Sequence, residues 1–599
     1  MSEKKYPFSK VLMRIIPLHF RSNPWMNVFF ILLGFLNALI FTGGVIATKN
    51  LFDTIASAVD GQLSFIDCFI PLLLMASAIF GNQILECVFF LLSQAIWDRS
   101  VGALRLLQQR KISRLDPILF EQTQFLDDLT KGKEGAPAIP GFVSVIFEVM
   151  SNQLMYFIMI GAYLFWLKPL LVVALLISFV PALLSQIIRA KVYTRLEEES
   201  APIRRENEYY EKAMTDREYF KETRILGAFS YFYKLFADTL SHLSVKMWRA
   251  DRRMALLELA MDTTTFAGMA VSSYLLFSAL MAGEISVGAF AAIFATLGDI
   301  FNTMWWVMVH EFGQINQDIG KVTNFVKLLD LPELSGSEAT PDFTQGIVAD
   351  NVSFTYPDRD EPAVRNLTLR IADGETIAIV GENGAGKSTL VRLLAGLYRP
   401  SDGTVHIGGM DTSSASAHSI YQATSGVFQR YQRYKMTMAD NVSLSNKYDS
   451  DLPDLSKIDV VLKDAGAEFD ASVGEDTMLS PEFGGIDLSG GQWQRLAIAR
   501  GLYRSHAFIL LDEPTAAIDP IEETRIYTQF KKLAADKCAV VVTHRLGSAR
   551  LANRILVMEA GEIVDEGTHE ELMSRPGKYK DMWAVQAKWY ERPVEMKDS

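Results

Sequence analysis

The sequence predicts an α-helical membrane domain with six spans, fused to an α/β domain that carries a phosphate-binding loop. Three observations predict this architecture. Long apolar windows fill the first half of the 599 residues, short β-branched runs alternate with helical patterns from Ile347 onward, and a GxxxxGK[ST] motif follows one of these runs. Apolar windows of about 20 residues are long enough to cross a bilayer as helices. Alternating strands and helices are typical of a parallel sheet covered by helices.

Six windows in the first half have the length needed to cross ~30 Å of hydrocarbon. Two of them carry no charged residue, and the other four carry one acidic residue each. A buried helix of a soluble core explains any single window, but soluble cores do not repeat such lengths. We therefore assign residues 1–330 to a membrane domain, with spans at Trp25–Thr48, Phe69–Leu92, Phe142–Leu167, Leu170–Ile188, Met261–Gly283 and Ile285–Val309.

The basic residues predict the orientation of these spans. An even number of spans places both ends of the chain on one side of the membrane. Lys4, Lys5, Arg14 and Arg21 precede the first span, and the long segments 98–140 and 189–253 are also basic. Because Lys and Arg accumulate in cytoplasmic loops, we expect a multi-pass protein of the plasma or inner membrane, in contact with lipid, with both termini in the cytoplasm. Two short amphipathic stretches, Leu119–Leu129 and Arg217–Phe229, are expected at the cytoplasmic tips of the helical hairpins.

The composition excludes several classes of protein. The formal net charge is −12, whereas a nucleic-acid-binding protein needs a basic face, so we expect no nucleic-acid partner. The three cysteines lie far apart without a CxxC spacing, which indicates neither a disulfide framework nor a zinc site. The polar N-terminus lacks the short apolar core of a removable signal peptide.

The second half divides into a linker, a domain and a tail. The linker is the polar segment 331–346, the α/β domain is residues 347–580, and the C-terminal tail is residues 581–599. Within the domain, the strand pattern Thr376–Val380 runs into the motif GENGAGKS and then into a helical run. This strand, loop and helix form the context that a phosphate-binding loop requires.

The phosphate loop predicts an ATP site. Its glycines allow backbone N–H groups to surround phosphate oxygens at a helix N-terminus, where the helix dipole also favours anions. We expect Lys387 to contact the β- and γ-phosphates and the Ser388 hydroxyl to bind Mg²⁺. The predicted nucleotide-binding residues of this segment are Gly381, Glu382, Asn383, Gly384, Ala385, Gly386, Lys387, Ser388 and Thr389.

Two further strand ends carry polar residues suited to hydrolysis. Asp512 and Glu513 follow the apolar run Phe508–Leu511, and His544 follows the run Ala539–Val542. Asp512 is placed to hold Mg²⁺, and Glu513 is placed to polarise the attacking water. A surface acidic pair is the alternative for these two carboxylates. The phosphate loop upstream favours the catalytic interpretation, because parallel strand ends converge at one edge of a sheet.

The pentapeptide LSGGQ, Leu488–Gln492, stands immediately before a helical run. Adjacent glycines are costly in ordered structure, and an ordinary glycine turn is one explanation for them. Together with the phosphate loop, however, the pentapeptide resembles the signature of ATP-binding cassette (ABC) transporters. Nearly the whole chain resembles their half-transporter exporters, with one six-helix membrane domain ahead of one cassette. This resemblance implies that Ser489, Gly490, Gly491 and Gln492 contact the ATP held by the phosphate loop of a second chain.

The resemblance also implies roles for individual residues. Tyr356 is similar to the aromatic residue that stacks on adenine, although an ordinary strand tyrosine is the alternative. Gln429 resembles the glutamine that links Mg²⁺ and the attacking water to the membrane domain. Asp519 resembles an aspartate at the interface between cassettes, and His544 resembles the switch histidine that senses the γ-phosphate. Phe120-Glu121 and Lys221–Arg224 resemble coupling helices, which dock on cassettes.

The implied function is that of an ATP-driven exporter that acts as a dimer. All motifs are intact, which favours a homodimer over a heterodimer. The segment SPEFGGID before the signature, and Trp493 after it, resemble bacterial peptide and lantibiotic exporters more than multidrug exporters. A multidrug or lipid exporter, and a non-pumping channel or sensor, are the alternatives.

Acidic residues in the membrane half predict a cationic substrate. Ionised carboxylates that face lipid are costly, so they are expected to face the bundle interior or a water-filled cavity. We expect Glu258 and Glu311, near span ends, to pair with basic residues instead. Unpaired acids in a low-dielectric cavity attract cations, and tryptophans add cation–π contacts. The candidate cavity residues are Asp262, Asp299, Glu148, Trp305 and Trp306, and a cationic amphipathic peptide is the expected substrate.

Overall fold

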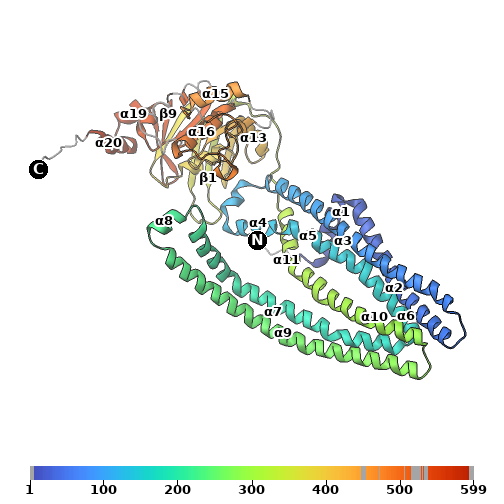
Figure 1. Ribbon diagram of the computed structural model, residues 1–599. Helices are drawn as coiled ribbons and strands as arrows, with labels where there is room; N and C mark the ends of the chain where they lie inside the picture. The colour runs from blue at the N-terminus through green and yellow to red at the C-terminus, as the bar shows by residue number, and fades with distance from the viewer. Residues whose placement is uncertain are drawn as a thin grey trace. The chain divides into compact units, whose positions relative to one another are not determined.

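The computed structural model describes residues 6–591, apart from 447–453, 471–472, 505, 514–527, 529, 532–533 and 535–536. The chain forms two compact units (Figure 1). The first unit comprises Met1–Ser113 and Asp127–Leu331, and the second comprises Arg114–Leu126 and Pro332–Ser599. The segment Arg114–Leu126 therefore belongs by its contacts to the second unit, although the sequence analysis included it in the membrane domain.

The described residues of the first unit form helices joined by short connections. Six helical stretches are long and apolar enough to cross a membrane, and each contains one of the predicted spans or nearly all of it. Its elements are α1 (Phe8–Ser22), α2 (Pro24–Val59), η1 (Phe65–Cys68), α3 (Phe69–Ile112), α4 (Thr123–Lys133), α5 (Gly135–Glu148), η3 (Val149–Gln153), α6 (Leu154–Leu167), α7 (Pro169–Thr215), α8 (Phe220–Ile225), α9 (Phe229–Met281), α10 (Val287–Trp305), η4 (Trp306–Glu311) and α11 (Phe312–Leu329).

Helices α7 and α9 are much longer than a bilayer requires. They contain 47 and 53 residues, which corresponds to about 70–80 Å at 1.5 Å per residue. The two helices run side by side and are joined by the short helix α8 (Figure 1). The prediction that these spans extend well beyond the hydrocarbon is consistent with these lengths.

Two of the six spans contain a π-helical turn. Segment η3 joins α5 to α6, and segment η4 joins α10 to α11. In η3, the Ser151 hydroxyl donates a hydrogen bond to the Phe147 carbonyl at 2.7 Å. Such turns insert an extra residue into a helix and are frequent at functional sites. The two π turns contact one another, so the third and sixth spans pack together at these turns.

The second unit contains two sheets. A four-stranded antiparallel sheet has the order β2-β1-β4-β5, and a six-stranded sheet has the order β10-β9-β3-β8-β7-β6. In the larger sheet only β10 is antiparallel to its neighbour. The strands are β1 (Ile347–Phe354), β2 (Val364–Ile371), β3 (Thr376–Gly381), β4 (Asp402–Ile407), β5 (Met410–Asp411), β6 (Thr424–Val427), β7 (Phe508–Asp512), β8 (Cys538–Val542), β9 (Arg554–Glu559) and β10 (Glu562–Gly567).

Helices cover both sheets of this unit. Helix α12 packs into the apolar cluster shared by the two sheets, whereas α16 packs with α14 and α15 in a second cluster against β6, β7 and β8. The helices are η2 (Pro117–Glu121), η5 (Phe343–Gln345), α12 (Lys387–Leu394), α13 (Ala417–Ala423), α14 (Met438–Ser443), η6 (Leu444–Asn446), α15 (Leu455–Asp464), η7 (Pro481–Phe483), α16 (Gly490–Tyr503), α18 (Leu546–Ala549), α19 (His569–Ser574) and α20 (Lys578–Glu591). Helix α20 crosses the predicted boundary between domain and tail at 580/581.

Candidate active site

The predicted site residues lie at one edge of the six-stranded sheet. Strands β3, β8, β7 and β6 are neighbours and run parallel, so their carboxyl ends meet at the same edge. The phosphate loop follows β3, Gln429 lies two residues after β6, Glu513 follows β7, and His544 lies two residues after β8. Four segments that are far apart in sequence therefore supply one site.

The phosphate loop has the conformation that its glycines allow. Gly384 and Gly386 have φ values of +83° and +93°, a region that side-chain-bearing residues rarely adopt. At Gly386 a Cβ atom would also lie 2.4 Å from the Ala363 carbonyl oxygen. Lys387 begins helix α12, and its Nζ donates to the carbonyl oxygens of Gly381 at 2.9 Å and Glu382 at 2.8 Å. Burial lowers the pKa of Lys387, while the negative charges of Glu513 and Asp512 oppose this shift.

Ser388 and Asp512 lie next to one another. The Ser388 hydroxyl donates to Oδ1 of Asp512 at 3.3 Å, and Asp512 is only 5% exposed. Burial raises the pKa of Asp512, the adjacent Glu513 charge raises it further, and the Ser388 hydrogen bond opposes both. A cation at these oxygens would reverse that shift, because an opposite charge favours the carboxylate. The hydroxyl and carboxylate oxygens are the ligand type that Mg²⁺ prefers.

Glu513 is held from two sides. Gln429 donates through Nε2 to Oε2 of Glu513 at 2.7 Å, and Nε2 of His544 contacts the other oxygen, Oε1. The Glu513 backbone has a φ of +48°, which is strained for a residue with a side chain and is typical of functional sites. Its N–H donates to the Val542 carbonyl at 3.1 Å. The structure therefore brings together Glu513, Gln429 and His544, each of which was predicted separately as a site residue.

Tyr356 lies just beyond β1 and beside the phosphate-loop helix. Its hydroxyl is 3.1 Å from the Thr389 hydroxyl and accepts a hydrogen bond from Arg392 at 3.0 Å. The Tyr356 ring meets the rings of Phe354 and Tyr398 edge to face. Adenine stacking by Tyr356 stays a prediction, and Asp519 lies outside the described residues.

The signature residues begin helix α16. Ser489 is its N-cap: the Gln492 N–H donates to the Ser489 hydroxyl at 3.2 Å, and the Ser489 N–H donates to Gln492 Oε1 at 3.0 Å. A Cβ atom added at Gly490 or at Gly491 would meet nothing within 4 Å. Packing within the described part of the chain therefore does not require these two glycines. The open Cβ positions leave room for a molecule to approach the backbone there.

The two predicted coupling stretches differ in their surroundings. In the second unit, Glu121 at the end of η2 accepts a hydrogen bond from the Tyr398 hydroxyl and lies 3.8 Å from Arg392. In the first unit, exposed apolar residues lie at the end of α8: its last residue, Ile225, is 85% exposed, and the next residue, Leu226, is 70% exposed. Exposed apolar side chains at such a tip are expected where a helix docks on a partner surface.

Glu258 and Glu311, two acidic residues of the membrane half, differ in their partners. Glu258 pairs with Arg189 at 3.0 Å, which confirms the prediction that it is paired. For Glu311 that prediction is wrong. Glu311 is 4% exposed, accepts a hydrogen bond from Nε1 of Trp306 at 3.0 Å, and has no Lys or Arg partner among the described residues. Its other carboxylate oxygen is buried and has no hydrogen-bond partner among them.

Glu148 lies near Glu311, and the π turn that follows Glu148 contacts the π turn that ends at Glu311. It accepts a hydrogen bond from Gln153 at 3.2 Å, and Gln153 Oε1 is buried without a partner in the described structure. Gln153 was not predicted as a partner, because it lies five residues from Glu148, a spacing that an α-helix does not bring together. The spacing of Trp306 and Glu311 is also five.

The remaining cavity candidates are exposed on the single chain. Asp262 lies on α9 and Asp299 on α10, and both are exposed. Asp299 lies within electrostatic range of the buried Tyr156 hydroxyl. Trp305 and Trp306 are 46% and 45% exposed. The structure therefore groups Glu148 with Glu311 and Trp306, and does not bring Asp262 to them.

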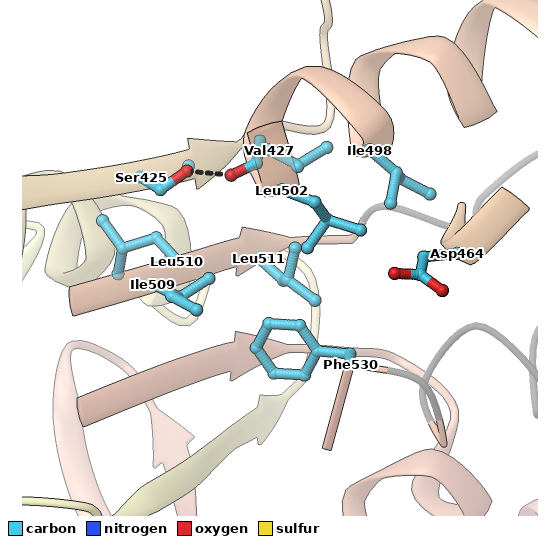
Figure 2. A pocket seen from close by; sticks show the side chains of 11 residues that line it. Ser425, Val427, Asp464, Ile498, Leu502, Ile509, Leu510, Leu511 and Phe530 are labelled. Atoms are coloured by element: carbon cyan, nitrogen blue, oxygen red, sulfur yellow. Dashed lines mark hydrogen bonds between the residues drawn. The ribbon is translucent and has the colours of Figure 1, made fainter. Parts of the chain in front are cut away.

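An apolar pocket lies elsewhere in the second unit (Figure 2). It is enclosed by Ile498 and Leu502 of α16, by Leu511 of β7 and by Phe530. The Ser425 hydroxyl at its rim donates to the Gly501 carbonyl. None of the predicted nucleotide-binding residues is among those that line it. This pocket belongs to the packing of α16 on the sheet and not to the candidate site.

Comparisons with known proteins agree with this geometry. A family model described as ABC transporter matches residues 364–516. The chain is 31% identical to the subtilin transport ATP-binding protein of Bacillus subtilis, over 63% of this chain and 62% of that protein. It is 30% identical to an ATP-dependent lipid A-core flippase of Polaromonas sp., over 74% of each chain. The match thus spans less than two thirds of the subtilin relative.

The fold also resembles a solved structure along nearly its whole length. A bacterial Atm1-family ABC exporter with ATP bound superposes with a TM-score of 0.81 and 22% sequence identity, covering 95% of this chain and 98% of that chain. This likeness shows the fold: a six-helix membrane unit and a cassette unit on one chain.

Proposed function

Because the chain belongs to the ABC transporter family, we propose that it is an ATP-driven exporter that acts as a dimer of two such chains. The observation that carries the proposal is the arrangement around Glu513. Its carboxylate is held by Gln429 and His544 at the sheet edge that also carries the phosphate loop. This arrangement suits the hydrolysis of a terminal phosphate.

The chemistry assigns each residue a task. Glu513 accepts a proton from the attacking water, and Gln429 and His544 fix the direction in which its oxygens point. Lys387 balances phosphate charge. Ser388, Asp512 and Gln429 would hold Mg²⁺, which when bound neutralises charge on the phosphate oxygens. The proximity of the Ser388 and Asp512 oxygens and the buried Asp512 carboxylate support this ligand set.

The open space above the signature glycines supports the dimer. A Cβ atom at Gly490 or Gly491 would have no neighbour within 4 Å in the described chain, and the two glycines stand at the N-terminus of a 14-residue helix. A helix N-terminus attracts anions, and glycines allow a phosphate to approach the backbone closely. The γ-phosphate of ATP bound to a second copy of this chain fits both properties.

We place the protein in the plasma or inner membrane, with the cassette and both termini in the cytoplasm. The six apolar helices support the membrane location, and the excess of Lys and Arg in the long segments supports the orientation. Uptake into inverted vesicles tests the proposal. A pump accumulates substrate against a gradient when ATP is added, whereas a channel reaches no higher than equilibrium.

A cationic amphipathic peptide is the proposed substrate. Acidic groups in the membrane half support it: Asp262 and Asp299 are exposed on the chain, and Glu148 and Glu311 lie near one another. Trp305 and Trp306 offer half-exposed rings nearby in sequence. Relatives named for subtilin and nisin transport are consistent with this class of substrate. A lipid flippase is the second candidate, because relatives at about the same identity are named lipid A-core flippases.

The double variant Asp262→Asn, Asp299→Asn separates these candidates. Removing two negative charges per chain should raise the concentration of a cationic peptide needed for half-maximal ATPase stimulation about tenfold, which is ~1.4 kcal/mol. Basal ATPase should change little. Glu86→Gln is the matched control, since Glu86 lies in another span and accepts a hydrogen bond from Asn82. If neutral lipids or anionic drugs stimulate the ATPase of the wild type and of the double variant equally well, the proposed cationic substrate is wrong. The exporter proposal is unaffected by that result.

A further inference from the structure

The last described helix, α20, packs against the elements that frame the active site. Tyr579 of α20 is fully buried in a cluster with Ala378 and Val380 of β3, the strand that leads into the phosphate loop. The same cluster contains Leu546 and Ala549 of α18, the helix that begins two residues after His544. Helix α20 therefore supports the structural elements on both sides of the site.

Gln586 on α20 binds the backbone beside His544. Its Nε2 donates to the His544 carbonyl at 2.5 Å, and its Oε1 accepts from the Leu546 N–H at 3.0 Å. A carboxamide has both a donor and an acceptor, so one side chain fixes two peptide groups that flank Arg545. The Arg545 N–H in turn donates to the Thr543 hydroxyl at 3.0 Å. The backbone around His544 is thus held from both sides.

Lys578, at the start of α20, contacts the phosphate loop. Its Nζ lies 2.8 Å from a carboxylate oxygen of Glu382 and 2.7 Å from one of Glu559. The hydrogen bond and charge of Lys578 lower the pKa of Glu382. Exposed ion pairs contribute little to stability, so we regard Lys578 as a weak link and Gln586 as the main one.

We propose that α20 positions the hydrolysis site and that Gln586 is a positioning residue for His544. The two hydrogen bonds of Gln586 fix the peptide planes next to His544 and so fix the direction of its Cα–Cβ bond. The imidazole then remains in contact with Glu513. A displacement of about 1 Å at a catalytic group reduces rates markedly. This inference rests on the proposed ATPase function and adds a residue from the predicted tail to it.

Gln586→Ala tests the inference in the full-length dimer. We expect kcat for ATP hydrolysis to fall about tenfold, with KM for ATP within about twofold, because the phosphate loop itself is unchanged. The melting temperature should stay within a few degrees. Gln586→Glu should not rescue the rate, since it loses the donor and places a negative charge against the His544 carbonyl. Val585→Ala is the control, because Val585 is exposed on the same helix and should leave the rate unchanged.

A double-variant cycle distinguishes positioning from general stabilisation. If Gln586 acts through His544, adding Gln586→Ala to His544→Ala should lower the residual rate no further. An additive loss, or a Gln586→Ala rate within twofold of the wild type, would overturn the inference. Absence of ATPase in both the wild type and the Val585→Ala protein would instead reject the proposed function. Binding of a fluorescent ATP analogue to Gln586→Ala should match the wild type and shows that the variant is folded.

Discussion

Replacing Glu513 by Gln is expected to reduce ATP hydrolysis by about 10²–10⁴-fold while nucleotide binding is retained. The amide has nearly the same shape and still accepts a hydrogen bond, but it does not accept a proton from water. The Gln429 and His544 contacts hold the carboxylate in place, so the loss comes from chemistry and not from a displaced loop. A steady-state ATPase assay on purified dimers measures the rate, and a binding assay with labelled ATP measures retention.

Glu562→Gln is a suitable control for this substitution. It makes the same chemical change at an exposed position on β10 and should leave the ATPase rate unaltered. With ATP and Mg²⁺, the Glu513→Gln protein should accumulate dimers closed around nucleotide, which crosslinking or size measurements detect. If more than a tenth of the wild-type rate survives, Glu513 is not the general base.

A mixed dimer is expected to lose the most ATP hydrolysis when a phosphate-loop substitution and a signature substitution are on the same chain. Consider Lys387→Ala and Gly491→Asp on the same chain, paired with a wild-type chain. If the signature acts on the partner's ATP, each composite site contains one lesion and hydrolysis is nearly abolished. If the signature acts on its own chain's ATP, the wild-type chain keeps an intact site. Placing the two lesions on different chains reverses the outcome: the trans arrangement then leaves one intact site.

Gly491→Asp suits this experiment because its effect on folding should be small. The Cβ position is open within the described chain, and an acidic residue in the first turn of a helix is favourable. The new carboxylate instead repels a phosphate that approaches the helix N-terminus. ATPase rates of tagged mixed dimers, purified through two different tags, give the result. Nearly full loss with the lesions on different chains, and retained activity with both on one chain, would contradict action in trans.

Most of the fold could be predicted because its signals are local. Each span is a continuous apolar run, and strands β3, β7 and β8 are short apolar runs that end at, or within two residues of, a polar site residue. Parallel strands bring such ends to one edge whatever their order in the sequence, so the meeting of Glu513 with His544 followed from the α/β pattern. The phosphate loop was likewise predictable because its glycines, Lys387 and Ser388 are contiguous.

The parts that could not be predicted depend on non-local or irregular geometry. An α-helical period places residues three and four apart on one face, whereas the π turns bring residues five apart together, as in the pairs Glu148–Gln153 and Trp306–Glu311. Glu311 was expected to pair with a basic residue because it lies near a span end, whereas the π turn places it against Trp306. The contacts of Gln586 could not be predicted, because the residues around it in the sequence do not show that it bonds to the backbone of His544 and Leu546.

The contacts of residues 114–126 also affect the order in which this protein folds during synthesis. Ile118 packs against the cluster shared by the two sheets of the cassette, and Glu121 binds Tyr398, 277 residues later in the chain. The ribosome therefore releases this segment long before its binding surface exists. Contacts between such distant residues form slowly, and apolar groups left exposed meanwhile favour aggregation. A cassette expressed alone from Pro332 lacks these partners, so it should be less soluble than the same cassette supplied with residues 114–126 as a peptide.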